Sequence, residues 1–381
     1  MTNPDTAAPV RFGMVGGGSG AFIGAVHRMA LALDHQGVLV AGALSSTPER
    51  SLASAKAIGL PSDRAYGSWD DMLKGEKQLP ESERIQAVSI VTPNDTHFEI
   101  AKAFVEAGCH VVLDKPMVTT SDEAAQLARA VGASNASLTV TYNYSGYPMV
   151  REARELVRTG AIGDVRKVFI EYHQGWLSTD VESSGNKQAS WRTDPKRSGG
   201  AGSLGDIGTH AEQLASFITG QTPSELCADV HSVVPGRQVD DDAAVLFRYA
   251  SGATGVLTCS QVCFGEENGL SIRLYGDKGS LAWRQEDPNN LYHRAADERL
   301  RVITRGSDGL SEAAAASGRI PPGHPEGFIE AFANIYRGAI DRVRGVDSHH
   351  ARLAPTVDDG AQGIRFVEAC LRSNGAWTDF E

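Results

Sequence analysis

A glycine-dense stretch near the start of the chain, VRFGMVGGGSGAFIGAVH at residues 10–27, constrains the fold more than any other feature. Its first part, Val10–Val15, is a short apolar run of the kind that forms a buried strand. After the glycines, Phe22–Leu33 repeats apolar residues at helical spacing. A strand, a glycine turn and a helix in this order form the first unit of a dinucleotide-binding fold.

The glycine turn fits the dinucleotide fingerprint as Gly16-x-Gly18-x-x-Ala21, while Gly20 and Gly24 offer a second register. Glycines let the backbone approach a pyrophosphate, whose charge is stabilised by N–H groups at the start of the helix. The alternative is a glycine-rich loop that binds nothing, and the flanking strand and helix weigh against it. Further cofactor contacts are expected from Ser19, Phe22 and Ile23.

Strands alternate with helices through the first part of the chain. Strands are expected at residues 38–44, 87–92, 110–113 and 138–142. Helices are expected at residues 48–57, at 121–131, and between His97 and Ala107. This alternation predicts a doubly wound parallel sheet, in which ligands bind beyond the carboxyl ends of the strands.

The end of the second predicted strand bears on the choice of nucleotide. An Asp or Glu at this place binds the ribose of NAD, but here Ser45 and Ser46 follow the strand and the first acid is Glu49. With Arg50 close by, these hydroxyl residues can accept a 2′-phosphate, which slightly favours NADP. Hydroxyls also bind a ribose, so the choice between NAD and NADP stays open.

The pattern changes after Tyr142, which divides the chain into residues 1–141 and residues 142–381. An alternating strand is expected at 165–173, a long polar stretch runs from 175 to 202, and a series of short strands fills 225–283. Helices are expected at residues 147–159, 206–219, 326–343 and 358–371. We therefore predict a C-terminal α+β domain with a large, open, mainly antiparallel sheet. Its uncovered face favours a homodimer or homotetramer.

Composition narrows the classes of partner. The net charge of −11 and the lack of a basic stripe argue against nucleic acid. No apolar run is long enough to span a bilayer, the start of the chain lacks a signal peptide, and the five scattered cysteines suit a reducing cytoplasm. Asp240, Asp241 and Asp242 are interpreted as a solvated strand entry, so no metal site is predicted.

Several spaced motifs resemble the Gfo/Idh/MocA family of oxidoreductases over nearly the whole chain. They are the turn at residues 16–27, Thr92-Pro93-Asn94 with His97, Asp114-Lys115-Pro116 where the family usually has Glu-Lys-Pro, GDIGTH at residues 205–210, and Pro355-Thr356 with Asp359-Gly360. Within the family, the glycine turn, Asn143-Tyr144 and Trp191-Arg192 resemble the branch of levoglucosan dehydrogenase-like sugar dehydrogenases.

The resemblance implies roles for three residues that also suit the chemistry. Oxidising an alcohol requires a base with a pKa near neutrality, which favours His210 as general acid/base. Asp206, four residues earlier, would anchor the substrate and set the environment of this histidine. Lys115 would orient the reacting hydroxyl. The alternatives are a helix cap for Asp206, core packing for His210 and a surface position for Lys115.

The resemblance also implies the remaining contacts. For the cofactor they are Thr92, Pro93, Asn94, His97, Asp114 and Lys115. For the substrate they are Tyr144, Tyr147, Trp176, Trp191 and Arg192, together with Asp206 and His210. The aromatic rings suit the C–H faces of a sugar, although core packing is a close alternative.

Together these features predict a cytoplasmic NAD(P)-dependent dehydrogenase. Its substrate would carry a secondary hydroxyl on a sugar, anhydrosugar, glycoside or cyclitol. Three alternatives stay open: a reductase of a keto-sugar in vivo, an enzyme that cycles hydride on a permanently bound cofactor, and a non-catalytic dinucleotide-binding regulator.

Overall fold

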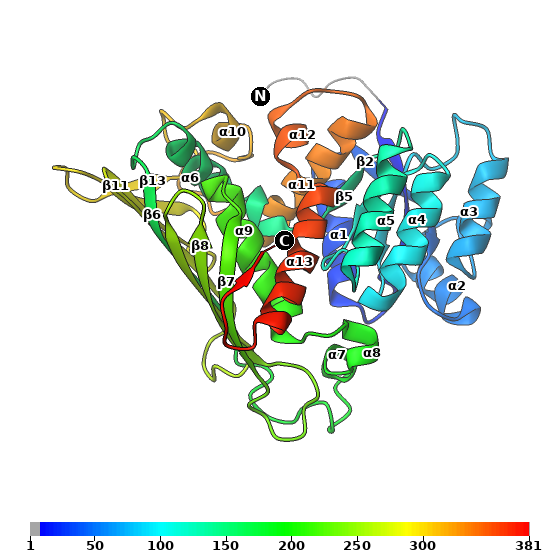
Figure 1. The fold of residues 1–381 in the computed structure, drawn as a ribbon. Helices are drawn as coiled ribbons and strands as arrows, with labels where there is room; N and C mark the ends of the chain where they lie inside the picture. Colours follow the sequence, from blue (N-terminus) through cyan, green and yellow to red (C-terminus); the bar gives the residue numbers. More distant parts are fainter. Residues whose placement is uncertain (1–7, 381) are drawn as a thin grey trace.

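Two sheets with a layer of helices between them organise the chain (Figure 1). The computed structural model describes residues 8–380. In Figure 1 the parallel sheet lies on the right among its helices, and the larger sheet lies on the left with its outer face uncovered. Across the described residues, no helix is both long and apolar enough to cross a membrane.

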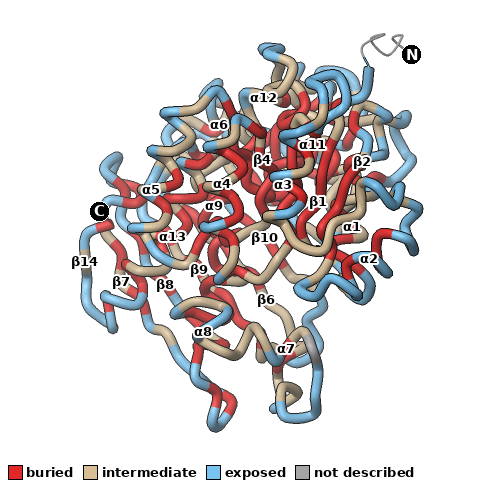
Figure 2. Tube along the Cα trace, turned by 90° about the vertical axis from the view of Figure 1, so that its right-hand side faces the viewer, coloured by how far each residue is buried: buried red, intermediate tan, exposed pale blue. Residues whose placement is uncertain are grey.

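The parallel sheet has five strands in the order β2-β1-β3-β4-β5, which confirms the predicted doubly wound fold. The strands are β1 (Val10–Gly16), β2 (Gly37–Ala43), β3 (Ala87–Val91), β4 (His110–Leu113) and β5 (Leu138–Val140). Every residue of β3 is buried, as expected where helices cover both faces of a sheet. The neighbouring strands β1 and β4 are also mostly buried (Figure 2).

Five helices connect and flank these strands. They are α1 (Phe22–Leu33), α2 (Pro48–Ala57), α3 (Trp69–Gln78), α4 (His97–Glu106) and α5 (Ser121–Gly132), with 3-10 turns η1 (Ser62–Arg64) and η2 (Asn94–Thr96). The helix α3 was not predicted. Only Met72 and Glu76 of it are buried, so its sequence carries a weak apolar pattern.

Helices from the end of the chain return to this parallel sheet. Helix α11 (Phe328–Val343) packs against α1, and the hydroxyl of its Tyr336 lies 2.8 Å from both His27 Nδ1 and Ser89 Oγ. Helix α13 (Val357–Ser373) contributes residues to the hydrophobic cores of both sheets. We retain the division at residue 141 as a proposal, with α11 and α13 bridging the two parts.

The larger sheet has nine strands in the order β13-β12-β11-β10-β6-β9-β8-β7-β14. All neighbours are antiparallel except β6 and β9, because β6 enters the middle of the sheet from earlier in the chain. The strands are β6 (Val165–His173), β7 (Pro223–His231), β8 (Asp242–Tyr249), β9 (Thr254–Ser260), β10 (Gly269–Gly276), β11 (Gly279–Arg284), β12 (Asn290–Ala295), β13 (Arg301–Thr304) and β14 (Thr378–Asp379).

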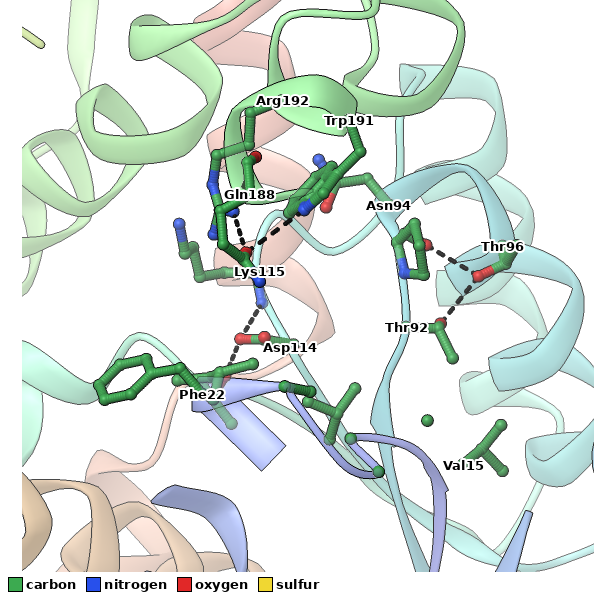
Figure 3. A pocket seen from close by; sticks show the side chains of 18 of the residues that line it. Val15, Phe22, Thr92, Asn94, Thr96, Asp114, Lys115, Gln188, Trp191 and Arg192 are labelled. Carbon is green, nitrogen blue, oxygen red and sulfur yellow. Dashed lines mark hydrogen bonds between the residues drawn. The ribbon is translucent and has the colours of Figure 1, made fainter. Parts of the chain in front are cut away.

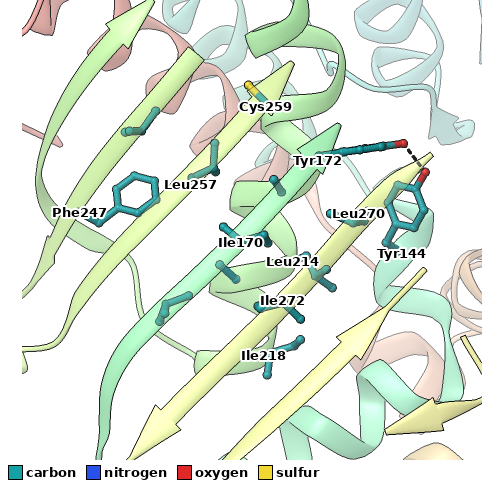
Figure 4. Close-up of a cluster of buried hydrophobic side chains, with 14 of the residues drawn as sticks. Tyr144, Ile170, Tyr172, Leu214, Ile218, Phe247, Leu257, Cys259, Leu270 and Ile272 are labelled. Atoms are coloured by element: carbon teal, nitrogen blue, oxygen red, sulfur yellow. Dashed lines mark hydrogen bonds between the residues drawn. The ribbon is translucent and has the colours of Figure 1, made fainter. Parts of the chain in front are cut away.

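One face of the larger sheet is covered and the other is open. Ile170 and Ile272 on the covered face pack against Leu214 and Ile218 of α9 (Figure 4). The remaining helices and turns are α6 (Pro148–Arg158), α7 (Lys187–Arg192), α8 (Pro195–Ser198), α9 (Thr209–Thr219), α10 (Glu312–Ala315), α12 (His349–Leu353), η3 (Asn143–Gly146) and the π-helical turn η4 (Leu204–Gly208).

The long polar stretch after β6 forms a structured cover. We call residues 174–202 the covering segment. It holds the short helices α7 and α8, drawn in green at the bottom of Figure 1 between the two sheets. The helix predicted at 206–219 begins with η4, so Asp206 lies in the π-helical turn and His210 lies in α9.

Candidate active site

One cavity of about 1400 Å³ runs from the glycine turn, past the carboxyl ends of the parallel strands, to the larger sheet. The covering segment forms part of its wall. Most of the residues predicted for the site line this cavity. They are Gly16, Gly18, Ser19, Ala21, Phe22, Ile23, Ser45, Ser46, Arg50, Thr92, Pro93, Asn94, Asp114, Lys115, Tyr144, Trp176, Trp191, Arg192, Asp206 and His210.

The glycine turn packs so closely on neighbouring backbone that side chains would not fit at several of its positions. Gly16 has a φ of +78°, and a Cβ atom there would lie 2.5 Å from the carbonyl oxygen of Val91. Gly18 N–H donates to the Leu44 carbonyl at 3.0 Å, so the turn lies against the end of β2. A Cβ on Gly24 would lie 2.2 Å from the oxygen of Gly17. The second register of the fingerprint therefore provides the close packing of α1 on the turn.

The start of α1 suits an anionic group. In the described structure, no side chain caps the helix at Ala21, and the first turn contains no acidic residue. The first backbone N–H groups of the helix are therefore free to bind a pyrophosphate. Together with the cavity that Gly16 and Gly18 line, this shows that the residues fit a dinucleotide.

The adenosine side of the cavity carries hydroxyls and one cation. Ser45, Ser46 and Arg50 line it, and Ser54 and Trp69, which were not predicted, line it as well. Ser54 Oγ accepts a hydrogen bond from the backbone of the glycine turn at 3.2 Å. Among the lining residues that β2 and α2 supply, none is acidic.

Asp206 is the centre of a charged cluster. Lys115 Nζ lies 2.7 Å from Asp206 Oδ1, and Arg192 Nε lies 3.3 Å from Oδ2. The amide of Gln261 donates to Oδ2 at 2.9 Å. Burial by itself raises the pKa of the Asp206 carboxyl, but these two cations and the hydrogen bonds from Lys115 and Gln261 outweigh it and hold that pKa well below its usual range. Asp206 is therefore a carboxylate.

His210 lies one turn beyond Asp206 in a pocket of aromatic rings. The rings of Tyr144 and Tyr142 approach it edge-on, with centroids 4.8 and 5.6 Å away. Its Nδ1 is buried without a hydrogen-bond partner among the described residues, which leaves Nε2 as the ring nitrogen that reaches the cavity. Burial lowers the pKa of His210 well below its ordinary value, and the charge of Lys115 lowers it further. The imidazole is therefore neutral at pH 7.

The strand ends that carry Lys115 are fixed by short hydrogen bonds. Asp114 Oδ1 accepts from the Lys115 backbone and from Thr141 Oγ1, both at 2.9 Å. His97 Nδ1 and Nε2 lie 3.0 Å and 2.9 Å from the carbonyl oxygens of Pro116 and Thr92. His97 is fully buried and does not line the cavity, so the structure does not support its predicted contact with the cofactor. It braces the two strand ends instead.

A network of hydroxyls and amides lines the substrate side of the cavity. The hydroxyls of Tyr144 and Tyr172 are 2.6 Å apart (Figure 4), and Tyr172 donates to Asn268 Oδ1 at 2.7 Å. Gln174 Nε2 donates to the same oxygen at 2.9 Å. Tyr172, Gln174, Asn268 and Gln285 line the cavity but were not predicted. The alternation of β6 placed Tyr172 on the buried face, whereas Asn268 and Gln285 lie near strand ends without a sequence signal.

Helix α7 brings side chains of the covering segment over Lys115 (Figure 3). The guanidinium of Arg192 lies 4.3 Å from the ring centroid of Trp191 and 6.0 Å from that of Trp176. Gln188 Oε1 accepts from Arg192 Nη1 at 2.6 Å and from Trp191 Nε1 at 3.4 Å (Figure 3). One face of Trp191 is thus covered by a cation.

Two further predicted residues, Tyr147 and Gly20, are not among the residues that line the main cavity. Tyr147 is buried, stacks on Tyr144 at 6.3 Å and packs on Trp283, so it belongs to the core. The structure does not support its predicted contact with the substrate. Gly20 borders a second hollow of about 400 Å³, which shares Gly18, Ser19, Ala21 and Phe22 with the lining of the main cavity. Gly20 itself does not line the main cavity, so its predicted contact with the cofactor stays a prediction.

The acidic triplet is not a solvated strand entry. Asp240 and Asp241 are buried, at 8% and 0% exposure, and both accept several hydrogen bonds from neighbouring segments. The prediction failed because it considered only the alternation of the strand and not the loops that fold over it. Within residues 8–380, no group of three or more His, Cys, Asp or Glu is arranged to hold a metal ion.

Comparisons with known proteins match both parts of the chain. Residues 10–142 match a family model described as "Oxidoreductase family, NAD-binding Rossmann fold", and residues 150–282 match the "GFO/IDH/MocA C-terminal domain". The uncharacterised oxidoreductase YfiI of Bacillus subtilis (strain 168) is 34% identical over 98% of this chain and 97% of its own length. The first part of the chain is therefore an NAD-binding domain.

Two relatives have names that state a ligand. Levoglucosan dehydrogenase of Pseudarthrobacter phenanthrenivorans is 28% identical over 73% of this chain and 74% of its own length. The inositol dehydrogenase homologue of Azotobacter vinelandii, solved with NAD+, is 36% identical with a TM-score of 0.93 over 98% of each chain. The same homologue has also been solved with NADH and myo-inositol.

Proposed function

Because this chain belongs to the Gfo/Idh/MocA family of oxidoreductases, we propose that it transfers hydride between a nicotinamide dinucleotide and a secondary alcohol. The alcohol belongs to a sugar, anhydrosugar, glycoside or cyclitol. One observation carries the proposal. The cluster of Lys115, Asp206 and His210 lines the same cavity as a glycine turn built for a dinucleotide.

The residues of the nucleotide side hold the cofactor in this proposal. The glycine turn and the start of α1 bind the pyrophosphate, and Ser45, Ser46 and Arg50 bind the adenosine ribose or its 2′-phosphate. When bound, the nicotinamide supplies a hydride acceptor for oxidation or a hydride donor for reduction. Thr92, Pro93 and Asn94, which line the cavity at the end of β3, would help to hold it.

The proton of the alcohol is removed by the chain's own residues. His210 is neutral, so Nε2 accepts the hydroxyl proton as the carbonyl forms and returns it in the reverse direction. Lys115 Nζ donates a hydrogen bond to the same oxygen and stabilises the negative charge that develops on it. Asp206 Oδ1 pairs with this ammonium at 2.7 Å, and the carboxylate also accepts a hydrogen bond from a second hydroxyl of the substrate.

The polar groups of the cavity support an uncharged polyol. Lys115 and Arg192 share the carboxylate of Asp206, so each of these two cations already has an ion-pair partner in the cavity. Hydroxyls and amides of Tyr144, Tyr172 and Asn268 offer both donors and acceptors to ring hydroxyls. Levoglucosan, after which one similar protein is named, and myo-inositol, with which another was solved, are both uncharged polyols.

The direction of the reaction depends on the cofactor ratio, so reduction of a keto-sugar in vivo uses the same site. A purely regulatory, non-catalytic role is disfavoured by the joined cluster of Lys115, Asp206 and His210. We also propose that the protein is cytoplasmic, because its five cysteines are free thiols. The uncovered face of the larger sheet exposes Leu246 and Tyr275, which supports a homodimer or homotetramer that light scattering would detect.

The proposal is tested in two steps on the purified protein. Fluorescence titration with NADH and NADPH separately measures nucleotide binding. An absorbance assay then screens levoglucosan, glucose and myo-inositol for reduction of NAD+ and NADP+. Tight binding with turnover of one polyol is the expected result. Binding without turnover of any sugar or cyclitol, or failure to bind either nucleotide, would contradict it.

A further inference from the structure

The covering segment supplies side chains to the cavity but contains little regular structure. Trp176, Gln188, Trp191 and Arg192 come from it, and the two helices α7 and α8 are both short. Such a segment keeps a fixed position only if contacts outside it hold it in place.

The start of the segment is bound by Arg237, whose side chain is fully buried. Its guanidinium pairs with both oxygens of Glu182 at 2.9 Å and donates to the carbonyl oxygens of Leu177 at 3.0 Å and Thr179 at 3.3 Å. On its other side, Arg237 Nη1 lies 2.8 Å from Asp241 Oδ2. A single planar cation thus links residues 177–182 to the start of β8.

The end of the segment is bound by the neighbouring carboxylate. Asp240 Oδ1 accepts from Gly202 N–H at 2.6 Å. Its Oδ2 accepts from Ser203 Oγ and Leu204 N–H, both at 2.7 Å. The turn η4 begins at Leu204, so the contacts of Asp240 fix the backbone just before Asp206.

Asp241 is also tied, through Gln261, to the charged cluster around Asp206. The carbonyl oxygen of Asp241 accepts from the backbone N–H of Gln261 at 2.8 Å, and the side chain of Gln261 donates to Asp206. Two consecutive residues, Asp240 and Asp241, therefore bind both ends of the covering segment. Asp241 also binds Gln261, which donates a hydrogen bond to Asp206. Arg192, in the middle of the segment, reaches the same carboxylate at 3.3 Å.

We propose that Asp240 and Asp241, the latter through Arg237 and Glu182, are positioning residues that clamp both ends of the covering segment over the substrate side of the cavity. This inference rests on the proposed function for its kinetic consequence. The clamp sets the position of Trp176, Trp191 and Arg192 and has no direct contact with the nucleotide side.

The central test is Glu182→Gln, which removes the charge that pairs with Arg237 and keeps the size of the side chain. Asp34→Asn is the matched control. Asp34 forms an equivalent two-pronged pair with Arg319, at 2.6 and 2.7 Å, and its side-chain exposure of 20% is close to the 18% of Glu182. Neither Asp34 nor Arg319 lines the cavity.

With the polyol that the wild type oxidises, Glu182→Gln is expected to raise KM about tenfold, while kcat and the nucleotide Kd change less than about threefold. Limited trypsin digestion provides a readout independent of activity. Cleavage after Arg192 or Arg197 is expected to be about fivefold faster in Glu182→Gln than in the wild type or Asp34→Asn, because the segment opens more often. Asp240→Asn, at the other end, is expected to accelerate the same cleavage.

Unchanged KM and unchanged cleavage in Glu182→Gln would overturn the clamp, as would an equal effect of Asp34→Asn. A nucleotide Kd that rises as much as KM would also overturn it, because the effect would then not be confined to the substrate side. If the wild type oxidises no polyol, the proposed function fails, while the trypsin comparison still decides whether the clamp exists.

Discussion

The two sides of the cavity are built in different ways. The pyrophosphate part of the nucleotide side consists mainly of backbone from a few consecutive residues, because the glycine turn and the start of α1 follow directly from β1. The substrate side consists of side chains from separate elements. Tyr144 comes from η3, Tyr172 from β6, Arg192 from α7 and Asp206 from η4, while Asn268 precedes β10.

This difference predicts different sensitivities to substitution. On the nucleotide side, a substitution matters where a new Cβ atom has no room, as at Gly18. On the substrate side, each functional group is supplied by one side chain, so truncation removes it outright. The two sides should therefore be separable, with variants that abolish turnover but spare nucleotide binding and variants with the opposite effect.

The largest effect is expected for Lys115→Met and His210→Asn. Each removes a group that handles the hydroxyl proton, so kcat/KM should fall about a thousandfold or more. The Kd for the nucleotide should change less than about threefold, since the glycine turn is untouched. Steady-state kinetics and fluorescence titration measure the two quantities. A parallel loss of nucleotide binding would show that the sides are not separable.

Gly18→Ala should produce the reverse pattern. Its Cβ would lie 2.4 Å from the carbonyl oxygen of Leu44, so the turn must shift away from β2. We expect the nucleotide Kd to rise about 30-fold, or ~2 kcal/mol. The control Gly132→Ala, at the end of α5, meets no atom within 4 Å and should leave Kd unchanged. Wild-type affinity in Gly18→Ala would contradict the account of the turn.

The pH dependence of oxidation reports on His210 directly. Burial and the charge of Lys115 lower the pKa of this imidazole. The ring therefore stays neutral, and able to accept a proton, at pH values below the ordinary pKa of histidine. Between about pH 8 and about pH 6.5, kcat/KM should fall less than about twofold. The decline of kcat/KM at acid pH should begin only below this range. In Lys115→Met the acid limb of the residual activity should shift to higher pH, because one cause of the lowered His210 pKa is gone. A wild-type limb at or above pH ~6.5 would contradict this.

The smallest effect is expected at the adenosine ribose. Arg50 is exposed, so its contribution to a 2′-phosphate is screened by water. Arg50→Ala should weaken NADPH binding about threefold to fivefold and leave NADH binding within about twofold. Parallel titrations with the two nucleotides measure the difference. Equal weakening of both would mean that Arg50 supports the fold of the turn and does not read the phosphate.

The same contrast explains what the sequence could predict. The parallel sheet, the glycine turn and the ends of β3 and β4 follow from local patterns, because each signal lies within a few residues. Asn268 and Gln285 could not be found in this way, since only the packing of the larger sheet brings them to the cavity. His97 was assigned to the cofactor because its motif lies at a strand end, although its ring points into the protein and binds two carbonyl oxygens.

Buried charge was the other source of error. Asp240 and Asp241 look like surface residues in the sequence, and their burial depends on Arg237 and on the loop that ends at Leu204. Sequence periodicity describes one strand at a time, so it does not reveal which segments fold over that strand.

Isotope transfer tests the central claim most directly. A polyol that the wild type oxidises is labelled with deuterium on the carbon that carries the reacting hydroxyl, and the reduced nucleotide is analysed by mass spectrometry. We predict that the deuterium appears in the nucleotide with the wild type and that the transfer is nearly lost with His210→Asn, while this variant still binds the nucleotide. Oxidised product without deuterium in the nucleotide, or full transfer by His210→Asn, would contradict the account.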